Sequence, residues 1–238
     1  MSNKILPIFH YFQFRGRALA SRVALFNSLG KEGWIDQRIS LPRFKKAPKE
    51  MYHKAPSERV RTAEYITNNL PQLNLPCGTK VSQSDAIARY AAKLSWNLSE
   101  QELPPHHVPN LYPMQPKDAL MVDEAVAIVD QILLLTPKDD DKETRLKNRQ
   151  AYHESGFLRV AMELLEGRLE ESGGPFVLGE HLSIADLYIR APLADLFDLG
   201  QFDGVPEEFY TSFPNVKKCA EAVPKHELLK AYHEHYRT

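Results

Sequence analysis

A proline-rich stretch in the middle of the chain separates two halves with different patterns. Residues 95–118 contain five prolines and almost no helical periodicity, which is typical of a linker. Before this stretch, short apolar runs alternate with helical patterns, whereas everything after it is helical. We therefore predict an α/β domain at 1–94, a linker at 95–118 and an all-α domain at 119–238.

The first half predicts the order strand, helix, strand, followed by two strands and a helix. A short apolar run is typical of a buried strand, and apolar residues then recur at helical spacing up to Gly30, where a helix would stop. The stretch 41–64 contains prolines and lysines without a clear period, so it predicts no regular element. The predicted elements are strands at 4–9, 34–40, 69–75 and 79–82, and helices at 15–30 and 82–94.

The second half predicts a bundle built around one central helix. Two adjacent apolar stripes indicate a helix that is buried on two sides. Ser183 and Asp186 have the spacing of a capping box at the start of a later helix, and Pro192 should kink that helix. The acidic run 139–143 indicates a solvated loop, and shorter helices are expected over 214–236. The apolar stripes are Met121, Ala125, Ile128 and Ile132; Val122, Val126, Val129 and Leu133; and, on a second helix, Leu158, Met162, Leu165 and Leu169.

Composition argues against several classes of partner. Thirty basic residues against thirty-one acidic ones leave a net charge of −1, so no global field draws the chain to nucleic acid or to an anionic membrane. Cys77 and Cys219 lie far apart and match no zinc-binding spacing, which predicts a reducing, cytoplasmic setting and no metal site. No stretch approaches the length of apolar sequence that a membrane span needs. We expect a soluble protein.

Four short motifs, taken in order, point to one family. They are YFQFRGRA at 11–18, NLPQL at 69–73, SQSDAIARYAA at 82–92 and LSIADLYI at 182–189. Together they resemble the motifs of cytosolic glutathione transferases of the tyrosine type, most closely the sigma class, which includes glutathione-dependent prostaglandin D synthases. The resemblance covers most of the chain. It implies a thioredoxin-like α/β N-terminal domain followed by an all-α helical-bundle C-terminal domain, with glutathione as co-substrate.

By this resemblance, Tyr11 and Arg17 are the expected catalytic residues. A free thiol with a pKa near 8.5 is mostly protonated at neutral pH, whereas the thiolate is the nucleophile. A hydrogen bond from the Tyr11 hydroxyl to the sulfur is worth about 1.5–3 kcal/mol, which lowers the thiol pKa by about one to two units. The Arg17 guanidinium adds positive potential, and Gly16 permits close packing at the turn.

The resemblance also assigns contacts along the glutathione backbone. Pro71 should be preceded by a cis peptide bond, so that the peptide group of Leu70, next to Asn69, pairs with the cysteinyl part of the tripeptide. Gln83 and Ser84 lie where a helix begins, and the N–H groups of such a terminus suit the γ-glutamyl carboxylate.

Two positions depart from the family pattern. Phe44 stands where the family commonly has a tryptophan for the glycyl carboxylate, and a phenyl ring has no N–H to donate. A nearby lysine should replace it, and Lys45, Lys46 and Lys49 are the candidates. In the helical half, Gln131 occupies the position of an aspartate that reaches the partner subunit's site. Either Gln131 makes that contact or the helix register places Asp130 there. Phe44, Lys49, Asp130 and Gln131 are thus the residues expected near the two ends of glutathione.

The resemblance implies a homodimeric glutathione transferase that conjugates the thiolate to a small hydrophobic electrophile. Phe12, Phe14 and Leu133 are the expected walls of the second substrate pocket. One alternative is an isomerase or peroxidase that uses the same thiolate, as in prostaglandin D synthases. The other is a non-catalytic binding or structural relative, against which the presence of Tyr11 and Arg17 argues.

Overall fold

The structure is a computed structural model that describes residues 5–46, 55–67 and 69–236. The chain divides into two compact units, one formed by Met1–Pro109 with Ala231–Thr238 and the other by Asn110–Lys230. This division differs from the expected one, because residues from 231 onward belong with the first unit. The reason is packing: the Tyr232 ring lies edge-on to Phe26, with centroids 5.7 Å apart.

The first unit is built on a four-stranded mixed sheet with the order β2-β1-β3-β4. β1 pairs in parallel with β2 and antiparallel with β3, and β3 pairs antiparallel with β4. This confirms the predicted order of elements. The first strand begins later than predicted, because Pro7 has no N–H for the ladder; its carbonyl accepts a bond from Ile35. The strands are β1 (Ile8–Phe12), β2 (Ile35–Ile39), β3 (Gln72–Asn74) and β4 (Lys80–Ser82).

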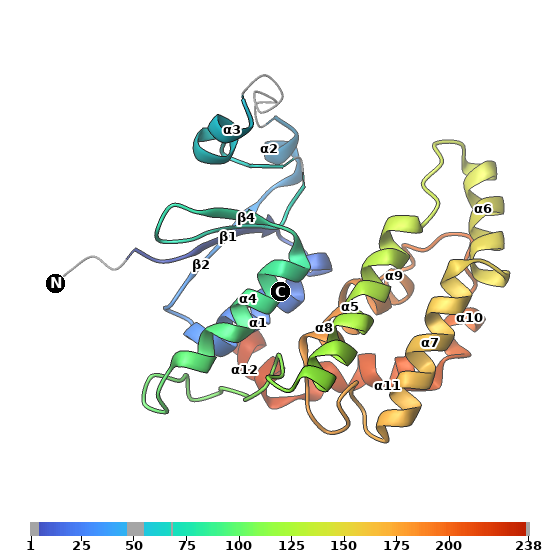
Figure 1. Ribbon diagram of the computed structural model, residues 1–238. Coiled ribbons are helices and arrows are strands. Elements are labelled where there is room, and N and C mark those ends of the chain that lie inside the picture. The colour runs from blue at the N-terminus through green and yellow to red at the C-terminus, as the bar shows by residue number, and fades with distance from the viewer. Residues whose placement is uncertain (1–4, 47–54, 68, 237–238) are drawn as a thin grey trace. The chain divides into compact units, whose positions relative to one another are not determined.

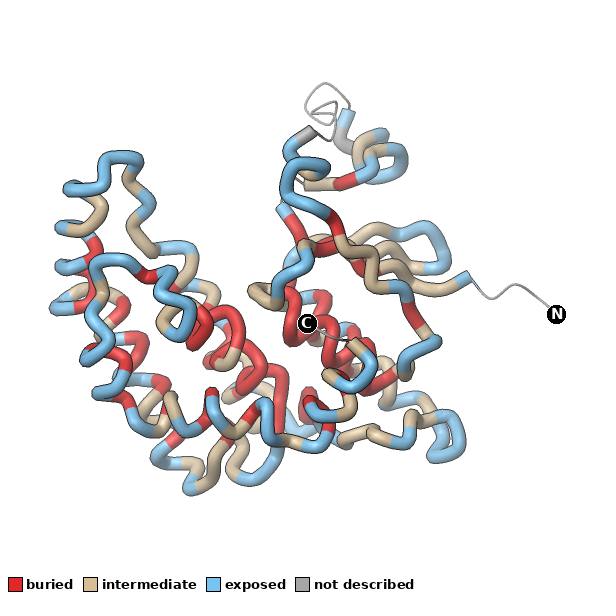
Figure 2. The backbone as a smooth tube through the Cα atoms, turned by 180° about the vertical axis from the view of Figure 1, so that it is seen from behind, coloured by how far each residue is buried: buried red, intermediate tan, exposed pale blue. Residues whose placement is uncertain are grey.

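Two helices of the first unit, α1 (Leu19–Leu29) and α4 (Ser84–Lys93), pack side by side on the sheet (Figure 1). A short 3₁₀ turn, η1 (Gly16–Ala18), connects β1 to α1, and η3 (Leu94–Asn97) follows α4. Every residue of α1 from Leu19 to Ser28 is buried, so this helix contributes much of the core of the unit, whose buried segments are red in Figure 2.

The stretch 41–64 contains two helices that the sequence pattern did not predict, α2 (Leu41–Lys46) and α3 (Pro56–Thr62). Pro42 and Pro56 each lie in the first turn of one of these helices. A proline is tolerated there, since the first N–H groups of a helix have no intrahelical acceptor. The prolines that suggested irregular structure therefore mark helix starts.

The second unit is helical throughout its regular elements, and α5 is its central helix. α5 packs against α7 and α8 and buries residues from both predicted stripes. α6 was not predicted, because Tyr152 is the only apolar side chain that it buries, beside Arg149 and His153. The elements are α5 (Pro116–Leu135), α6 (Lys142–Glu154), α7 (Phe157–Ser172), α8 (Ile184–Tyr188), the π-helical segment η4 (Ile189–Ala194), α9 (Asp195–Asp198), α10 (Glu207–Thr211), α11 (Pro214–Ala222), η5 (Val223–Lys225) and α12 (Glu227–His235), whose end joins the first unit.

The predicted capping box and kink are both present in the second unit. Ser183 precedes α8, and its N–H donates to the Asp186 carboxylate at 2.7 Å. Asp186 is fully buried, and burial raises its pKa to about 6, against the lowering effect of bonds from Val177, Ser183 and Cys219. The helical path breaks at Ala191, which has extended φ and ψ values immediately before Pro192.

Candidate active site

Hydrogen-bond register brings three of the predicted site segments to one end of the sheet. His10 of β1 is opposite Gln72 of β3, and Gln72 is in turn opposite Ser82 of β4. Because both pairings are antiparallel, the residues that follow His10 run toward those that precede Gln72, and toward those that follow Ser82. Tyr11, Pro71 and Gln83 therefore lie at the same sheet end.

Tyr11 is buried, with 5 % of its surface exposed, and lies next to the last residue of β1. Its hydroxyl oxygen accepts a hydrogen bond from the backbone N–H of Arg17 at 3.3 Å. Burial raises the pKa of the Tyr11 hydroxyl, whereas the Arg17 N–H and the charges of Arg17 and Arg22 act in the opposite direction. The hydroxyl consequently keeps its proton at neutral pH and can donate it in a hydrogen bond.

Gly16 makes the approach of Arg17 to Tyr11 possible. Its φ is +40°, a backbone conformation that side chains disfavour. A Cβ at this position would lie 2.9 Å from the Tyr11 hydroxyl oxygen and 3.0 Å from the Phe14 ring. Glycine is therefore required by both space and conformation.

Arg22 is a residue of this region that the sequence reasoning missed. It lies on α1 with 1 % exposed surface, and its guanidinium donates to the carbonyl oxygens of Phe12 at 2.8 Å and Phe14 at 3.0 Å. It also forms an ion pair with Asp36 of β2 at 3.0 Å. The signal in the sequence was that Arg22 is the only charged residue between Ala18 and Gly30.

Aromatic rings surround the end of β1. Phe14 contacts the rings of Tyr11 and Phe12, with centroids 5.6 and 5.4 Å apart. Phe44 of α2 lies edge-on to Phe12 at 5.5 Å and contacts Tyr65 at 5.4 Å. The structure thus brings Phe12, Phe14 and Phe44 together beside Tyr11, and Phe14 is 58 % exposed.

The peptide bond between Leu70 and Pro71 is cis, as predicted. Both residues are buried, and Asn69 before them is exposed, with its N–H bonded to the Thr67 hydroxyl at 3.3 Å. β3 begins only at Gln72, so the peptide group of Leu70 lies outside the strand ladder. That position suits the predicted backbone pairing with an extended peptide.

Gln83 and Ser84 lie at the start of α4. Gln83 has a φ of +83°, which is uncommon for a residue with a side chain, and its side chain is exposed. Ser84 is the first residue of α4, is 4 % exposed, and its carbonyl accepts a bond from the Ser21 hydroxyl at 3.2 Å. Strained backbone at a helix N-terminus is a common feature of ligand sites.

For the remaining predicted residues, the structure gives either the degree of exposure or no description. Lys49 lies outside the described residues, whereas Lys45 is exposed on α2, the helix that carries Phe44. In the second unit, Asp130 and Leu133 of α5 are partly exposed and Gln131 is exposed. The choice between Asp130 and Gln131 stays open.

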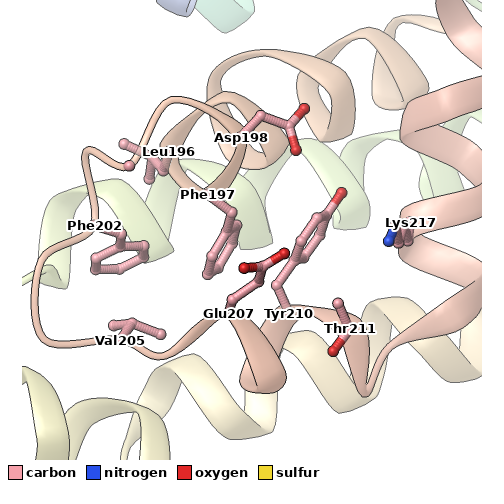
Figure 3. Close-up of a pocket in the computed structure, with 10 residues that line it drawn as sticks. Leu196, Phe197, Asp198, Phe202, Val205, Glu207, Tyr210, Thr211 and Lys217 are labelled. Carbon is pink, nitrogen blue, oxygen red and sulfur yellow. The ribbon is translucent and has the colours of Figure 1, made fainter.

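A separate pocket of about 610 Å³ lies wholly in the second unit, between the segment that follows α9 and helices α10 and α11 (Figure 3). The rings of Phe197 and Tyr210 stack in it at 4.6 Å, and Asp198 is paired with Arg190 at 2.7 Å. No predicted site residue lines this pocket. We therefore place the candidate active site at the end of the sheet in the first unit.

The described residues contain neither a metal-binding cluster nor a membrane-spanning helix. Over residues 5–46, 55–67 and 69–236, no group of three or more histidine, cysteine or acidic side chains could hold a metal ion. No helix in the same ranges is long and apolar enough to cross a membrane.

Comparison with known proteins agrees with the resemblance seen in the motifs. Residues 129–235 match the family model described as "Glutathione S-transferase, C-terminal domain". No curated protein matches the chain by sequence. Over residues 129–235 the chain is therefore similar to the C-terminal domain of glutathione S-transferases.

Solved structures extend the likeness to the whole chain. A rat hPGDS complexed with a quinoline has a TM-score of 0.66 at 19% identity, over 95% of this chain and 94% of that one. The prostaglandin synthase D of Nilaparvata lugens has a TM-score of 0.65 at 17% identity, over 96% and 97%. A sigma class GST of Fasciola hepatica has a TM-score of 0.64 at 19% identity, over 98% of both chains.

These similarities define the fold class of the protein. The chain has the fold of the glutathione transferases, in which a thioredoxin-like α/β unit precedes a helical unit. The predicted fold class is confirmed. Sigma class transferases and prostaglandin D synthases are among the structures that it resembles.

Proposed function

We propose that this protein is a glutathione transferase that activates the thiol of glutathione with Tyr11 and Arg17. The observation that carries the proposal is the buried Tyr11 hydroxyl, which keeps its proton and accepts the Arg17 N–H. With its oxygen already engaged as an acceptor, the hydroxyl is free to donate to a sulfur at the sheet end. A thiolate held there then attacks an electrophilic carbon, and a leaving group such as chloride departs with the electron pair.

The tripeptide would lie along the end of the sheet. Its cysteinyl backbone pairs with Leu70 beyond the strand ladder, and its γ-glutamyl carboxylate lies at the start of α4 near Gln83 and Ser84. The position of Asn69 next to Leu70 supports a further polar contact. These assignments rest on the register of β1, β3 and β4, which brings the segments together, and on the helix N-terminus.

The other end of the tripeptide needs a cation. Phe44 packs its ring against Phe12 and Tyr65, so it contributes apolar surface and no donor. We assign the glycyl carboxylate to a lysine of 45–49 and the γ-glutamyl amine to Asp130 or Gln131 of a partner subunit. The proposed assembly is thus a homodimer, which sedimentation velocity would test.

The second substrate would be a small hydrophobic electrophile. Phe14 is exposed although it is large and apolar, and it lies next to Tyr11 and Phe12. An apolar surface beside the nucleophile suits an apolar substrate, and Leu133 is the proposed contribution of the helical unit. Both cysteines are free thiols, which supports a reducing, cytoplasmic setting.

Ultraviolet titration of bound glutathione tests the proposal. Thiolate absorbance should appear with a midpoint about one to two pH units below that of free glutathione. Conjugation of a chloronitrobenzene should accompany it. A sulfhydryl that titrates as in plain buffer would refute the proposed activation.

A second function shares the same thiolate. Two of the similar structures are prostaglandin D synthases, so an isomerase reaction on a prostaglandin endoperoxide is the alternative. Product analysis with prostaglandin H2 alongside the chloronitrobenzene separates the two, because the isomerase consumes no glutathione. Glutathione binding without turnover on either substrate would instead indicate a binding protein.

A further inference from the structure

We propose that Arg22 is a positioning residue for thiol activation, because it holds both the Tyr11 ring and the turn that carries Arg17. This inference rests on the proposed function of Tyr11. It adds a residue that makes no contact with the reacting atoms.

The burial of Arg22 is the first observation. A charged side chain is costly to bury unless its donors are satisfied, and Arg22 retains only 1 % of its surface. Its hydrogen bonds go to Phe12 at the end of β1, to Phe14 just beyond it, and to Asp36 of the neighbouring strand β2. The guanidinium thus joins α1, β1 and β2 at the sheet end that carries the candidate site.

The second observation is the path between Tyr11 and Arg17. The two guanidinium nitrogens Nη1 and Nη2 hold the carbonyls of Phe14 and Phe12, which lie between these residues in the chain. The guanidinium carbon also lies 5.7 Å from the centroid of the Tyr11 ring. Arg22 therefore restrains the Tyr11 hydroxyl through the Tyr11 ring. It also restrains, through the turn, the Arg17 N–H that donates to this hydroxyl.

The third observation concerns Asp36, the ionic partner of Arg22. Its second carboxylate oxygen is bound by Arg38 at 2.9 Å, so Asp36 keeps one cation when Arg22 is replaced. The effect of replacing Arg22 should therefore fall mainly on the carbonyls of Phe12 and Phe14 and on Tyr11. Lysine cannot substitute, since a single ammonium cannot reproduce the planar fork.

The second unit offers a matched control in Arg149. This arginine is also buried, at 8 % exposure, and it donates to the carbonyls of Pro137 and Asp203. It is ion-paired with the Asp203 carboxylate and lies 5.5 Å from the centroid of the Phe202 ring. Arg149→Lys thus removes a similar set of contacts far along the chain from Tyr11.

The experiment compares Arg22→Lys, Arg149→Lys and the unsubstituted protein by three measurements. Thermal unfolding checks that each variant folds. Amide hydrogen exchange at Arg17, measured without glutathione, reports how firmly the turn is held. Ultraviolet titration and the pH profile of kcat/KM report the pKa of the glutathione thiol.

We expect both variants to lose thermal stability, and only Arg22→Lys to change the site. Exchange at Arg17 should become about tenfold faster, and kcat/KM near pH 6.5 should fall about tenfold, since small displacements of catalytic groups have large effects. Activity should recover at alkaline pH, where the thiolate forms unaided.

A folded Arg22→Lys protein with unchanged exchange at Arg17 and an unchanged thiol pKa would overturn the inference. Equal changes in Arg149→Lys would overturn it as well, because the effect would then be general loosening. If the unsubstituted protein leaves the thiol pKa at its solution value, the proposed function fails. Amide exchange at Arg17 would still decide whether Arg22 holds the turn.

Discussion

The hydroxyl oxygen of Tyr11 and the backbone nitrogen of Arg17 are 3.3 Å apart, with the N–H donating to the oxygen. Such a bond uses a lone pair of the oxygen and leaves the phenolic proton available. Chains of hydrogen bonds polarise one another inside a protein, so the Arg17 N–H makes the hydroxyl a better donor. The bond joins a strand residue to the backbone of a turn six positions further along the chain.

Replacing Tyr11 with phenylalanine tests the hydroxyl directly. The ring packing is kept and the donor is lost, so we expect turnover to fall about tenfold to a hundredfold, as when one anion-stabilising donor is removed. Steady-state kinetics with a chloronitrobenzene and glutathione would measure it.

Tyr232→Phe is the control for Tyr11→Phe. Tyr232 is fully buried, and in the described part of the chain its hydroxyl has no hydrogen-bond partner. Its loss should leave activity unchanged and stability unchanged or higher, because no bond is broken. Equal losses in the two variants would contradict a specific role for Tyr11.

Gly16→Ala should damage the site more than the fold. The backbone at φ +40° disfavours a side chain, which costs about 1–2 kcal/mol of unfolding free energy. The new methyl would also press on the Tyr11 hydroxyl at 2.9 Å. We expect lower stability in urea denaturation together with a clear loss of kcat.

Gly78→Ala separates these two effects. Gly78 has a φ of +90°, and no atom lies within 4 Å of the Cβ that alanine would add. The Gly78→Ala variant should lose stability in urea denaturation because of backbone strain, and its kcat should be unchanged. A Gly16→Ala protein with full activity would argue against the close packing described here.

Gln83→Gly should raise stability and weaken glutathione binding. A side chain at φ +83° costs about 1–3 kcal/mol, and the greater freedom of glycine in the unfolded chain offsets about 0.5–1 kcal/mol of the relief. A net gain of about 1 kcal/mol is expected in urea denaturation, with a higher Kd for glutathione in calorimetry.

Asn110→Gly provides the comparison for Gln83→Gly. Asn110 has a φ of +61° in the second unit and is not a predicted contact. Its replacement should leave the Kd for glutathione unchanged. A loss of stability in Gln83→Gly would contradict the backbone strain, and normal glutathione binding would contradict the ligand role of Gln83.

His10 should remain neutral below its usual titration range. Burial lowers the pKa of His10, partly opposed by the Glu64 charge. Its Nε2 lies 3.0 Å from the Asn74 amide nitrogen, and its buried Nδ1 has no partner among the described residues. The Asn74 amide donates to Nε2, so a proton on Nε2 would place two hydrogen-bond donors face to face and break this bond.

The sign of the pH effect follows from this lowered pKa. The folded state binds the His10 proton more weakly than the unfolded state, whose histidines titrate near pH 6.5. The contribution of His10 to stability is therefore present above about pH 6.5 and is lost as pH falls through the folded-state pKa. NMR titration of the ring should give a midpoint below 6.5, and Asn74→Asp should raise it. An equal or higher midpoint in the unsubstituted protein would contradict this prediction.

Much of the fold could be predicted from local pattern. The strands, α1 and α4 follow from apolar periodicity, and the capping box of Ser183 and Asp186 was visible as a spacing. Helices α2, α3 and α6 could not be predicted in this way, because two have a proline in their first turn and the third buries mainly polar side chains. Periodicity detects a helix only when that helix buries an apolar stripe.

The candidate site was predicted only in part. Motifs singled out Tyr11, Arg17, Pro71 and Gln83, because these residues are adjacent to recognisable turns and helix starts. Arg22 was missed, since its role depends on Asp36, fourteen positions away along the chain, and on carbonyl groups that no side-chain pattern reveals.

By itself, the sequence determined the types and order of the strands and of the helices that bury apolar stripes, and it singled out the residues proposed to activate a thiol, because propensity, capping and turn chemistry act over a few neighbours. Tertiary structure decided which of those residues meet. The pairing of β1 with both β2 and β3 brings Tyr11, Pro71 and Arg22 to one sheet end, and such pairing depends on contacts between segments that are distant in the chain. Close approach, as between Gly16 and the Tyr11 hydroxyl, follows from that packing alone.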